Sequence, residues 1–241
     1  MINLKEFIKC FRNTNYYNTL IANKSLIMIY VGGSYLWNMT DELSDLDICL
    51  VYREFEDYQK ELCYTFLEFH GVKGHFYADD LKEPFLNKKE GCKWFNHYRA
   101  ITLGILKEDN IIYKNNNYSK IIEYIFNNQK RIFKNAVYLS YKEKEDSLLP
   151  KLSVSTFNEK ELNQKFLYHF LMYSYYLTDE MPNKNFVLKV KRNKKNSLSE
   201  EDKKLISERL TIIKNFVDSY IPEYETIQSE INAIISEIKN N

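Results

Sequence analysis

Two aspartates, Asp45 and Asp47, are separated by a single leucine and lead into an apolar run that ends near Tyr52. Residues two apart on a β-strand project from the same face, so both carboxylates would point the same way. Neighbouring carboxylates repel each other unless a cation lies between them, and hard divalent ions bind oxygen ligands of this kind. The pair therefore predicts a site for Mg²⁺ or Mn²⁺ on a strand.

A glycine-rich turn lies shortly before the aspartates. The apolar residues 26–31 predict a buried strand, and Gly32, Gly33 and Ser34 follow it directly. A chain without a β-carbon can approach a phosphate closely, and a short helix beginning at Ser34 would direct its N–H groups and the positive end of its dipole at that phosphate. A phosphate cradle beside paired carboxylates predicts metal-assisted nucleotidyl transfer, in which the metal ions activate a hydroxyl and neutralise the leaving pyrophosphate.

The spacing of these residues resembles the signature of the DNA polymerase beta-like nucleotidyltransferase superfamily. Gly33-Ser34, ten further residues and then the sequence DLDI from Asp45 meet each term of that signature, over residues 28–52. The resemblance implies that Asp45 and Asp47 hold Mg²⁺ or Mn²⁺ and that a nucleoside triphosphate, such as ATP, is bound beside them. It implies nucleotide contacts at four residues: Gly32, Gly33, Ser34 and Ser44.

A second resemblance extends along the chain. The segments GSYLWNMTDELSDLDI, DDLKEPF and KFLYHFLMYSYYL, ahead of a helix containing SEED, are similar to predicted nucleotidyltransferases often encoded beside RNA ligases. In that subfamily a Lys-x-x-x-His pattern opens a helix of the second domain, and Lys165 and His169 match it. The resemblance implies that these two residues contact nucleotide or acceptor. Helix lysines are also often solvated, and a histidine among aromatic residues is often a core residue, so that reading stays open.

Superfamily members usually supply a third carboxylate from a neighbouring strand, where it acts as general base. The third strand predicted here is VKGHFYA, and the position that aligns with the acid is His75. A neutral imidazole is itself a suitable base. Asp79 and Asp80, at the far end of this strand, are the alternative base, although they also suit a helix cap. The third possibility is a site that binds nucleotide without turnover.

Periodic apolar patterns predict the elements that position these residues. We expect an opening helix around residues 4–11, strands over 26–31, 45–52 and 72–78, and helices over 55–69, 121–139, 161–177, 200–220 and 224–238. The basic run 189–195 predicts an exposed loop or a local contact for a phosphate backbone. The predicted fold is α+β: a small mixed β-sheet nucleotidyltransferase domain with flanking helices over residues 1–115, followed by a helical substrate or accessory domain over 116–241.

Composition limits the alternatives. The 241 residues carry a net charge of +1, which argues against an extended nucleic-acid track. The sequence shows neither the continuous apolar stretch of a membrane span nor a signal peptide, so we expect a cytoplasmic protein without a membrane partner. The four cysteines lack CxxC spacing and indicate reduced thiols rather than zinc ligands.

These patterns together predict a metal-dependent transferase that moves a nucleoside monophosphate from a nucleoside triphosphate to a hydroxyl. The acceptor is RNA, a protein side chain or a small molecule such as an aminoglycoside. Two alternatives stay open: a catalytically degenerate module that binds nucleotide or RNA, and an antitoxin-like partner of the same fold. The base preference, the acceptor and the oligomeric state do not follow from the sequence.

Overall fold

A computed structural model describes residues 4–40, 44–53, 66–81, 96–145, 161–192 and 198–239. The chain forms two compact units, one of residues 1–136 and 223–241 and the other of residues 137–222. The boundary falls inside helix α7 (Gln129–Glu145). Helices α6 (Ser119–Asn127) and α11 (Tyr224–Lys239) both follow residue 115 in the sequence and lie in the compact unit that contains the sheet. The predicted division at residue 115, as a division of function, stays a prediction.

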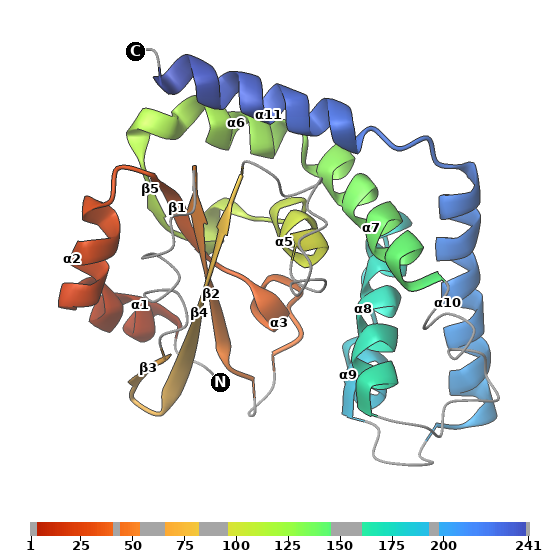
Figure 1. Cartoon of the computed structure of the whole chain (residues 1–241). Helices are drawn as coiled ribbons and strands as arrows, with labels where there is room; N and C mark the ends of the chain where they lie inside the picture. Colours follow the sequence, from red (N-terminus) through yellow and green to blue (C-terminus); the bar gives the residue numbers. More distant parts are fainter. Residues whose placement is uncertain are drawn as a thin grey trace. The chain divides into compact units, whose positions relative to one another are not determined.

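The first unit is built on a five-stranded sheet with the order β3-β4-β2-β1-β5 (Figure 1). Strands β2 and β4 are parallel, whereas the other neighbouring pairs are antiparallel. The sheet is therefore mixed, and the α+β prediction is confirmed. In sheet order the strands are Phe66–Phe69, Val72–Asp80, Leu46–Tyr52, Leu26–Val31 and Ile111–Lys114.

One face of the sheet carries the main core of this unit. Alternate residues of β2 point into it, as do Phe76 of β4 and Ile112 of β5. Helices α1 (Leu4–Arg12) and α2 (Asn15–Ala22) cover this face and contribute Phe7, Phe11 and Leu20, all of them buried. Thr14 begins α2 by accepting a hydrogen bond from the backbone N–H of Tyr17. The residues between those core positions on β2 must therefore face the other way.

The opposite face lies on the side of α3 (Gly33–Leu36) and α5 (Asn96–Leu103) (Figure 1). Tyr30 of β1 points to this side, and its hydroxyl lies 2.7 Å from the Thr102 hydroxyl of α5 in a fully buried contact. Cys49, the neighbour of Tyr30 across the β1–β2 ladder, is also buried. Asp47 lies two residues before Cys49 on β2 and so shares its face.

The prediction of a helix over residues 55–69 is wrong at its end. Residues 66–69 form β3, which pairs antiparallel with β4; residues 54–65 lie outside the described part of the chain. The connecting residues His70 and Gly71 have φ values of 52° and 76°. Positive φ at both central residues is what a type I′ hairpin turn requires, and its twist favours the pairing of the flanking strands. The turn therefore overrides the helical spacing of Phe66 and Phe69.

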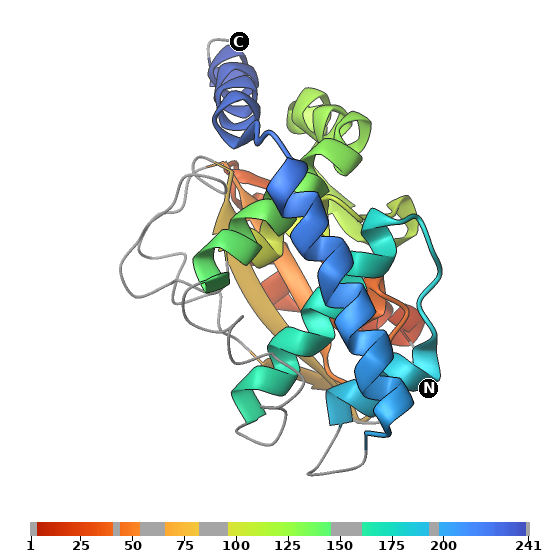
Figure 2. The ribbon, with the colours of Figure 1, turned by 90° about the vertical axis from the view of Figure 1, so that its right-hand side faces the viewer.

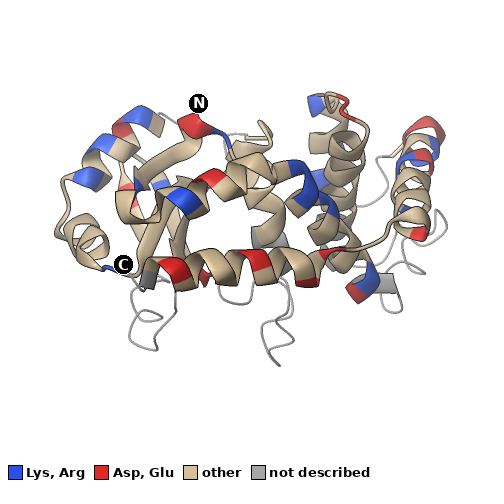
Figure 3. Cartoon of the chain, turned by 90° about the horizontal axis from the view of Figure 1, so that it is seen from above, with Lys and Arg blue, Asp and Glu red and all other residues tan. Residues whose placement is uncertain are grey.

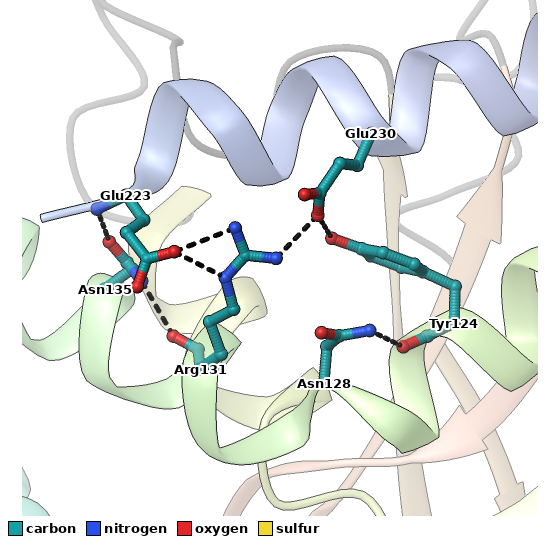
Figure 4. A network of polar contacts seen from close by, with 6 residues as sticks. All are labelled: Tyr124, Asn128, Arg131, Asn135, Glu223 and Glu230. Carbon is teal, nitrogen blue, oxygen red and sulfur yellow. Dashed lines mark hydrogen bonds and ion pairs between the residues drawn. The ribbon is translucent and has the colours of Figure 1, made fainter.

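A network of polar contacts holds α11 against α6 and α7 within the first unit (Figure 4). Arg131 of α7 donates to both glutamates that face it, at 2.9 Å to Glu223 and 2.6 Å to Glu230. The Tyr124 hydroxyl donates to Glu230 at 2.5 Å. Asn135 accepts a hydrogen bond from the backbone N–H of Glu223 at 2.6 Å and so caps the start of α11.

Helix α11 also reaches the sheet. The Gln228 side-chain amide, almost fully buried, donates to the backbone carbonyl of Leu81 at 2.9 Å, just beyond β4. The predicted helix over 121–139 is two helices, because α6 ends at Asn127 and α7 begins at Gln129. The Asn128 side chain donates to the carbonyl of Tyr124 at this break, which supports a local end of the first helix.

The second unit is helical. Helices α9 (Lys184–Arg192) and α10 (Glu200–Ser219) both pack on α8 (Glu161–Leu177) (Figure 2). Ser199 and Asp202 form a capping box at the start of α10. Arg209 of α10 donates to Glu180 at 2.5 Å and lies over the Tyr175 ring at 3.9 Å. These contacts join α10 to the end of α8.

The basic run 189–195 predicts an exposed loop or a local contact for a phosphate backbone; the structure corrects the loop for its first half, and the phosphate contact stays a prediction. Residues 189–192 form the last turn of α9, where Lys189 is ion-paired with Asp202; residues 193–197 lie outside the described part. Figure 3 shows basic and acidic positions interspersed over the helices of each unit. In the described part of the chain, no helix is both long and apolar enough to cross a membrane.

Candidate active site

The turn after β1 and the aspartate pair of β2 meet at one end of the sheet. Gly33 has a φ of +58°, and a β-carbon built on it would lie 1.6 Å from Asp47 Oδ2. The Asp47 carboxylate thus lies against the α-carbon of Gly33, in space that only glycine leaves open. The positive φ adds a second reason for glycine, because a left-handed backbone disfavours other residues.

The backbone fixes this contact from the other side of the turn. The Gly32 N–H donates to the carbonyl oxygen of Asp47 at 2.7 Å. A β-carbon on Gly32 would lie 2.7 Å from Cys49 Sγ, so this glycine too is required by close packing. The backbone of β2 and the glycine turn are therefore held together at this end of the sheet. The sequence patterns predicted a glycine turn that leaves room for a phosphate, and they did not predict that Asp47 itself would occupy the space at Gly33.

Asp45 lies immediately before β2, and His75 lies on β4. His75 Nε2 is 3.2 Å from Asp45 Oδ2, and the two side chains are 25% and 50% exposed. His75 is in register with Asp47 across the parallel β2–β4 ladder, so their side chains share a face. Asp45, Asp47 and His75 therefore gather on the same side of the sheet, the side that carries α3.

Asp79 and Asp80 lie further along β4. They are in register with Val51 and Tyr52, toward the opposite end of β2 from the Asp47–His75 pair. Asp79 lies four positions beyond His75 on the strand, about 13 Å of rise. Of the three candidates for the base, His75 is the one in contact with the aspartate pair. The helix that Asp79 and Asp80 were expected to cap would lie outside the described residues.

Ser34 occupies the first turn of α3, as predicted, and Gly32 is the residue before that helix. The helix has four residues, and the Ser34 carbonyl accepts a hydrogen bond from the Met39 N–H at 2.8 Å, which closes the turn that follows. Ser44 lies in the described residues directly before Asp45, outside regular structure. The nucleotide contacts expected of Ser34 and Ser44 stay predictions.

The protein side chains at this end of the sheet supply only some of the ligands that a hard divalent ion needs. In the described ranges, no group of three or more His, Cys, Asp or Glu side chains is arranged to hold a metal ion. Mg²⁺, however, commonly binds through one or two carboxylates plus substrate phosphates and water. Asp45 and Asp47 share a face beside the turn at Gly32 and Gly33, which carries no side chains. The residues therefore fit an ion that arrives with a triphosphate.

Lys165 and His169 lie on α8, in the second compact unit, while the aspartate pair lies in the first. The His169 ring lies 5.3 Å from the Tyr168 ring and 6.1 Å from the Tyr173 ring. Tyr173 is buried, and burial raises the pKa of its hydroxyl, as expected of a packing residue. A role for Lys165 or His169 in contacting nucleotide stays a prediction.

One group of residues beside the aspartates was missed by the sequence analysis. Phe66 of β3 is in register with His75, and the two ring centroids are 3.8 Å apart. Phe66 is nevertheless 60% exposed. The Tyr77 ring follows at 6.2 Å from the His75 ring, nearly parallel to it. The hairpin register places these rings together, and that register depends on a turn that the sequence analysis assigned to the end of a helix.

Comparisons with known proteins add little to this geometry. No protein-family model and no curated protein sequence matches the chain. The crystal structure of a nucleotidyltransferase-like protein from Exiguobacterium sibiricum 255-15 is similar, with a TM-score of 0.30 and 10% sequence identity over 86% of this chain and 73% of that one. Likeness at this level carries no conclusion about activity.

Proposed function

We propose that this protein is a nucleotidyltransferase that moves a nucleoside monophosphate from a nucleoside triphosphate to a hydroxyl group. The observation that carries the proposal is the convergence at one end of the central strands: Asp47 lies against Gly33, and Asp45 lies against His75. The first contact places a carboxylate against the glycine turn that would bind the phosphates, and the second places a carboxylate beside a candidate base. Transfer needs these parts side by side.

The donor triphosphate would lie along the Gly33–Ser34 turn, with its α-phosphate toward the aspartates. A bound Mg²⁺ or Mn²⁺ would neutralise charge on the phosphates and on the departing pyrophosphate. Asp45 and Asp47 would hold that ion. Because both carboxylates lie on the face that carries α3, opposite the α1–α2 core, they can serve a ligand without disturbing the packed interior.

His75 would take the proton of the attacking hydroxyl. A carboxylate only accepts hydrogen bonds, so in its contact with Asp45 the His75 Nε2 is the donor, and in the neutral ring Nδ1 is then the acceptor. The hydroxyl oxygen forms a bond to the α-phosphorus as the bond to pyrophosphate breaks. Asp45 thereby orients the ring, as a carboxylate orients the histidine of many acid–base pairs.

A transfer assay tests the proposal. Each nucleoside triphosphate, labelled on the α-phosphate, is incubated with the protein and Mg²⁺, first with total RNA and then with a protein extract. Label transfer that Asp45→Ala abolishes supports the transferase. Nucleotide binding without transfer in either mixture would instead support the degenerate module. Absence of both binding and transfer would favour the antitoxin-like reading.

A further inference from the structure

The strand order of the sheet separates two sides of the candidate site. Gly33 follows β1, and Asp45 and Asp47 lie at the start of β2. His75 lies on β4 and Phe66 on β3. Across the sheet, the glycine turn and Phe66 therefore flank the aspartates from opposite sides. This placement comes from the ladder registers and needs no bound ligand.

Phosphoryl transfer places the attacking and leaving oxygens roughly in line on either side of the phosphorus. If the pyrophosphate end of the donor lies at the glycine turn, the attacking hydroxyl approaches from the β4–β3 side. His75, the candidate base, lies on that side already. The surface next to His75 is then the surface that the acceptor meets first.

That surface presents an exposed aromatic ring. Phe66 is 60% exposed although its ring touches the His75 ring, whereas the neighbouring Leu67 packs against the core on the other face of the hairpin. Lys73 and Glu68 lie opposite each other next along the same face, both exposed, so their two charges offset each other. The flat apolar ring, rather than charge, is the feature that a ligand would recognise.

We propose that Phe66 stacks on a nucleobase of the acceptor, so that the acceptor hydroxyl belongs to a ribonucleotide. This inference rests on the proposed function and names the acceptor class of the same site. His75 connects Phe66 to Asp45. Its ring centroid is 3.8 Å from that of Phe66, and its Nε2 is 3.2 Å from Asp45 Oδ2. A nucleotide spans such a gap, because its hydroxyls lie one sugar away from its base. A phenolic acceptor carries its hydroxyl on the ring itself and would draw that ring away from Phe66.

The experiment measures acceptor binding in the absence of donor, on the full chain. The probes are a fluorescein-labelled octariboadenylate, followed by anisotropy, and AMP and a tyrosine-containing peptide, followed by calorimetry. Phe66→Ala should weaken nucleotide binding about 5-fold or more, since stacking on one base contributes about 1–3 kcal/mol. Phe66→Tyr should retain affinity within about 2-fold, because it keeps the ring. Phe66→Leu should behave like Phe66→Ala, because it keeps only the apolar character.

Met181→Ala is the matched control, since Met181 is an exposed apolar residue of the second unit. It should leave all three affinities unchanged. Thermal melts followed by circular dichroism should show Phe66→Ala folded like the parent protein, as its side chain is mostly exposed. Equal Phe66 dependence for AMP and the oligonucleotide would assign a single nucleotide as acceptor; dependence for the oligonucleotide alone would assign an RNA end.

Three results would overturn the inference: nucleotide binding that Phe66→Ala does not change, Phe66→Leu that binds like the parent protein, and Phe66 dependence seen for the tyrosine peptide only. Failure of the proposed function is separate from these. It would appear as an absence of Mg²⁺-dependent triphosphate binding at the site of Asp47, measured on the same preparations. If triphosphate binding holds and the Phe66 arm fails, only the acceptor assignment falls.

Discussion

The Asp47 carboxylate fills the space in which any residue other than glycine at position 33 would carry its β-carbon. A β-carbon there would lie 1.6 Å from Asp47 Oδ2 and 2.6 Å from its Cγ. The glycine turn and the carboxylate therefore cannot be altered independently. The position of the glycine turn and the position of the Asp47 carboxylate limit each other.

Gly33→Ala should damage both stability and ligand binding. The left-handed backbone alone should lower the free energy of unfolding by about 1–2 kcal/mol, and the methyl group should displace Asp47 in addition. Gly71→Ala is the matched control, because Gly71 also has positive φ, +76°, but has open space around the added carbon. Chemical denaturation and triphosphate calorimetry compare the two. Equal losses of stability and normal triphosphate binding in Gly33→Ala would contradict the contact.

Asp47→Asn should weaken Mg²⁺-dependent triphosphate binding by about 10-fold or more. Its stability should change little, since the backbone bond from Gly32 remains and the repulsion from Asp45 is relieved. Titration calorimetry with and without Mg²⁺ measures the effect. Asp109→Asn, at an exposed position before β5, should bind like the parent protein. Unchanged metal-dependent binding in Asp47→Asn would count against the proposed metal pair.

His75→Gln should separate turnover from donor binding. Loss of a general base typically lowers the rate by about 100-fold or more, while the triphosphate contacts on the β1 side should remain. Single-turnover transfer of labelled nucleotide reports the rate, and calorimetry reports donor affinity. His70→Asn, in the hairpin turn, is the control, since asparagine tolerates positive φ. A variant at position 75 that transfers at the parent rate would remove the histidine from the mechanism.

The contacts of α11 should make the first unit sensitive to acid. The pKa of Glu230 is lowered, chiefly because Arg131 donates to its carboxylate and next because the Tyr124 hydroxyl donates to it. A carboxyl whose pKa is lower in the folded state stabilises the fold above its ordinary pKa, and that contribution is lost as the pH falls through the folded value. Tm should therefore fall as the pH drops below about 4.5, the ordinary value for a glutamate.

Glu230→Gln tests this dependence. It should lower Tm near neutral pH, where the charged contacts are formed, and flatten the acid limb of the pH profile. Glu237→Gln, on the same helix at an exposed ion pair with Lys120, should leave the limb intact. If the two variants show the same pH profile, then the Arg131 contacts do not set the acid stability.

Local patterns in the sequence predicted the elements that carry their own boundaries. The apolar run of β1 ends at two glycines, and it was placed at residues 26–31, where the structure has it. Helix α8 was likewise placed at 161–177. Strand alternation also predicted that Asp45 and Asp47 would share a face. In each case the signal lies within the element or at its ends.

Features that depend on which strands pair could not be predicted from such local patterns. Phe66 and Phe69 have helical spacing, and only the hairpin turn at His70 and Gly71 makes them a strand. Strand β5 has four residues at the sheet edge, too few for a clear alternation. The exposed ring beside His75 followed from neither spacing nor composition, because it depends on which residue of β3 faces which residue of β4.

The second unit is an insertion within the first along the chain, since residues 137–222 separate the two segments, 1–136 and 223–241, that make up the first. During synthesis from the N-terminus, Arg131 can contact Glu223 only after 92 further residues have been added. Leu81 can contact Gln228 only after 147 further residues. The sheet can form on the ribosome before its last helix exists, while the helical unit can complete itself from one continuous stretch. The unit that carries the aspartate pair is therefore begun first and finished last.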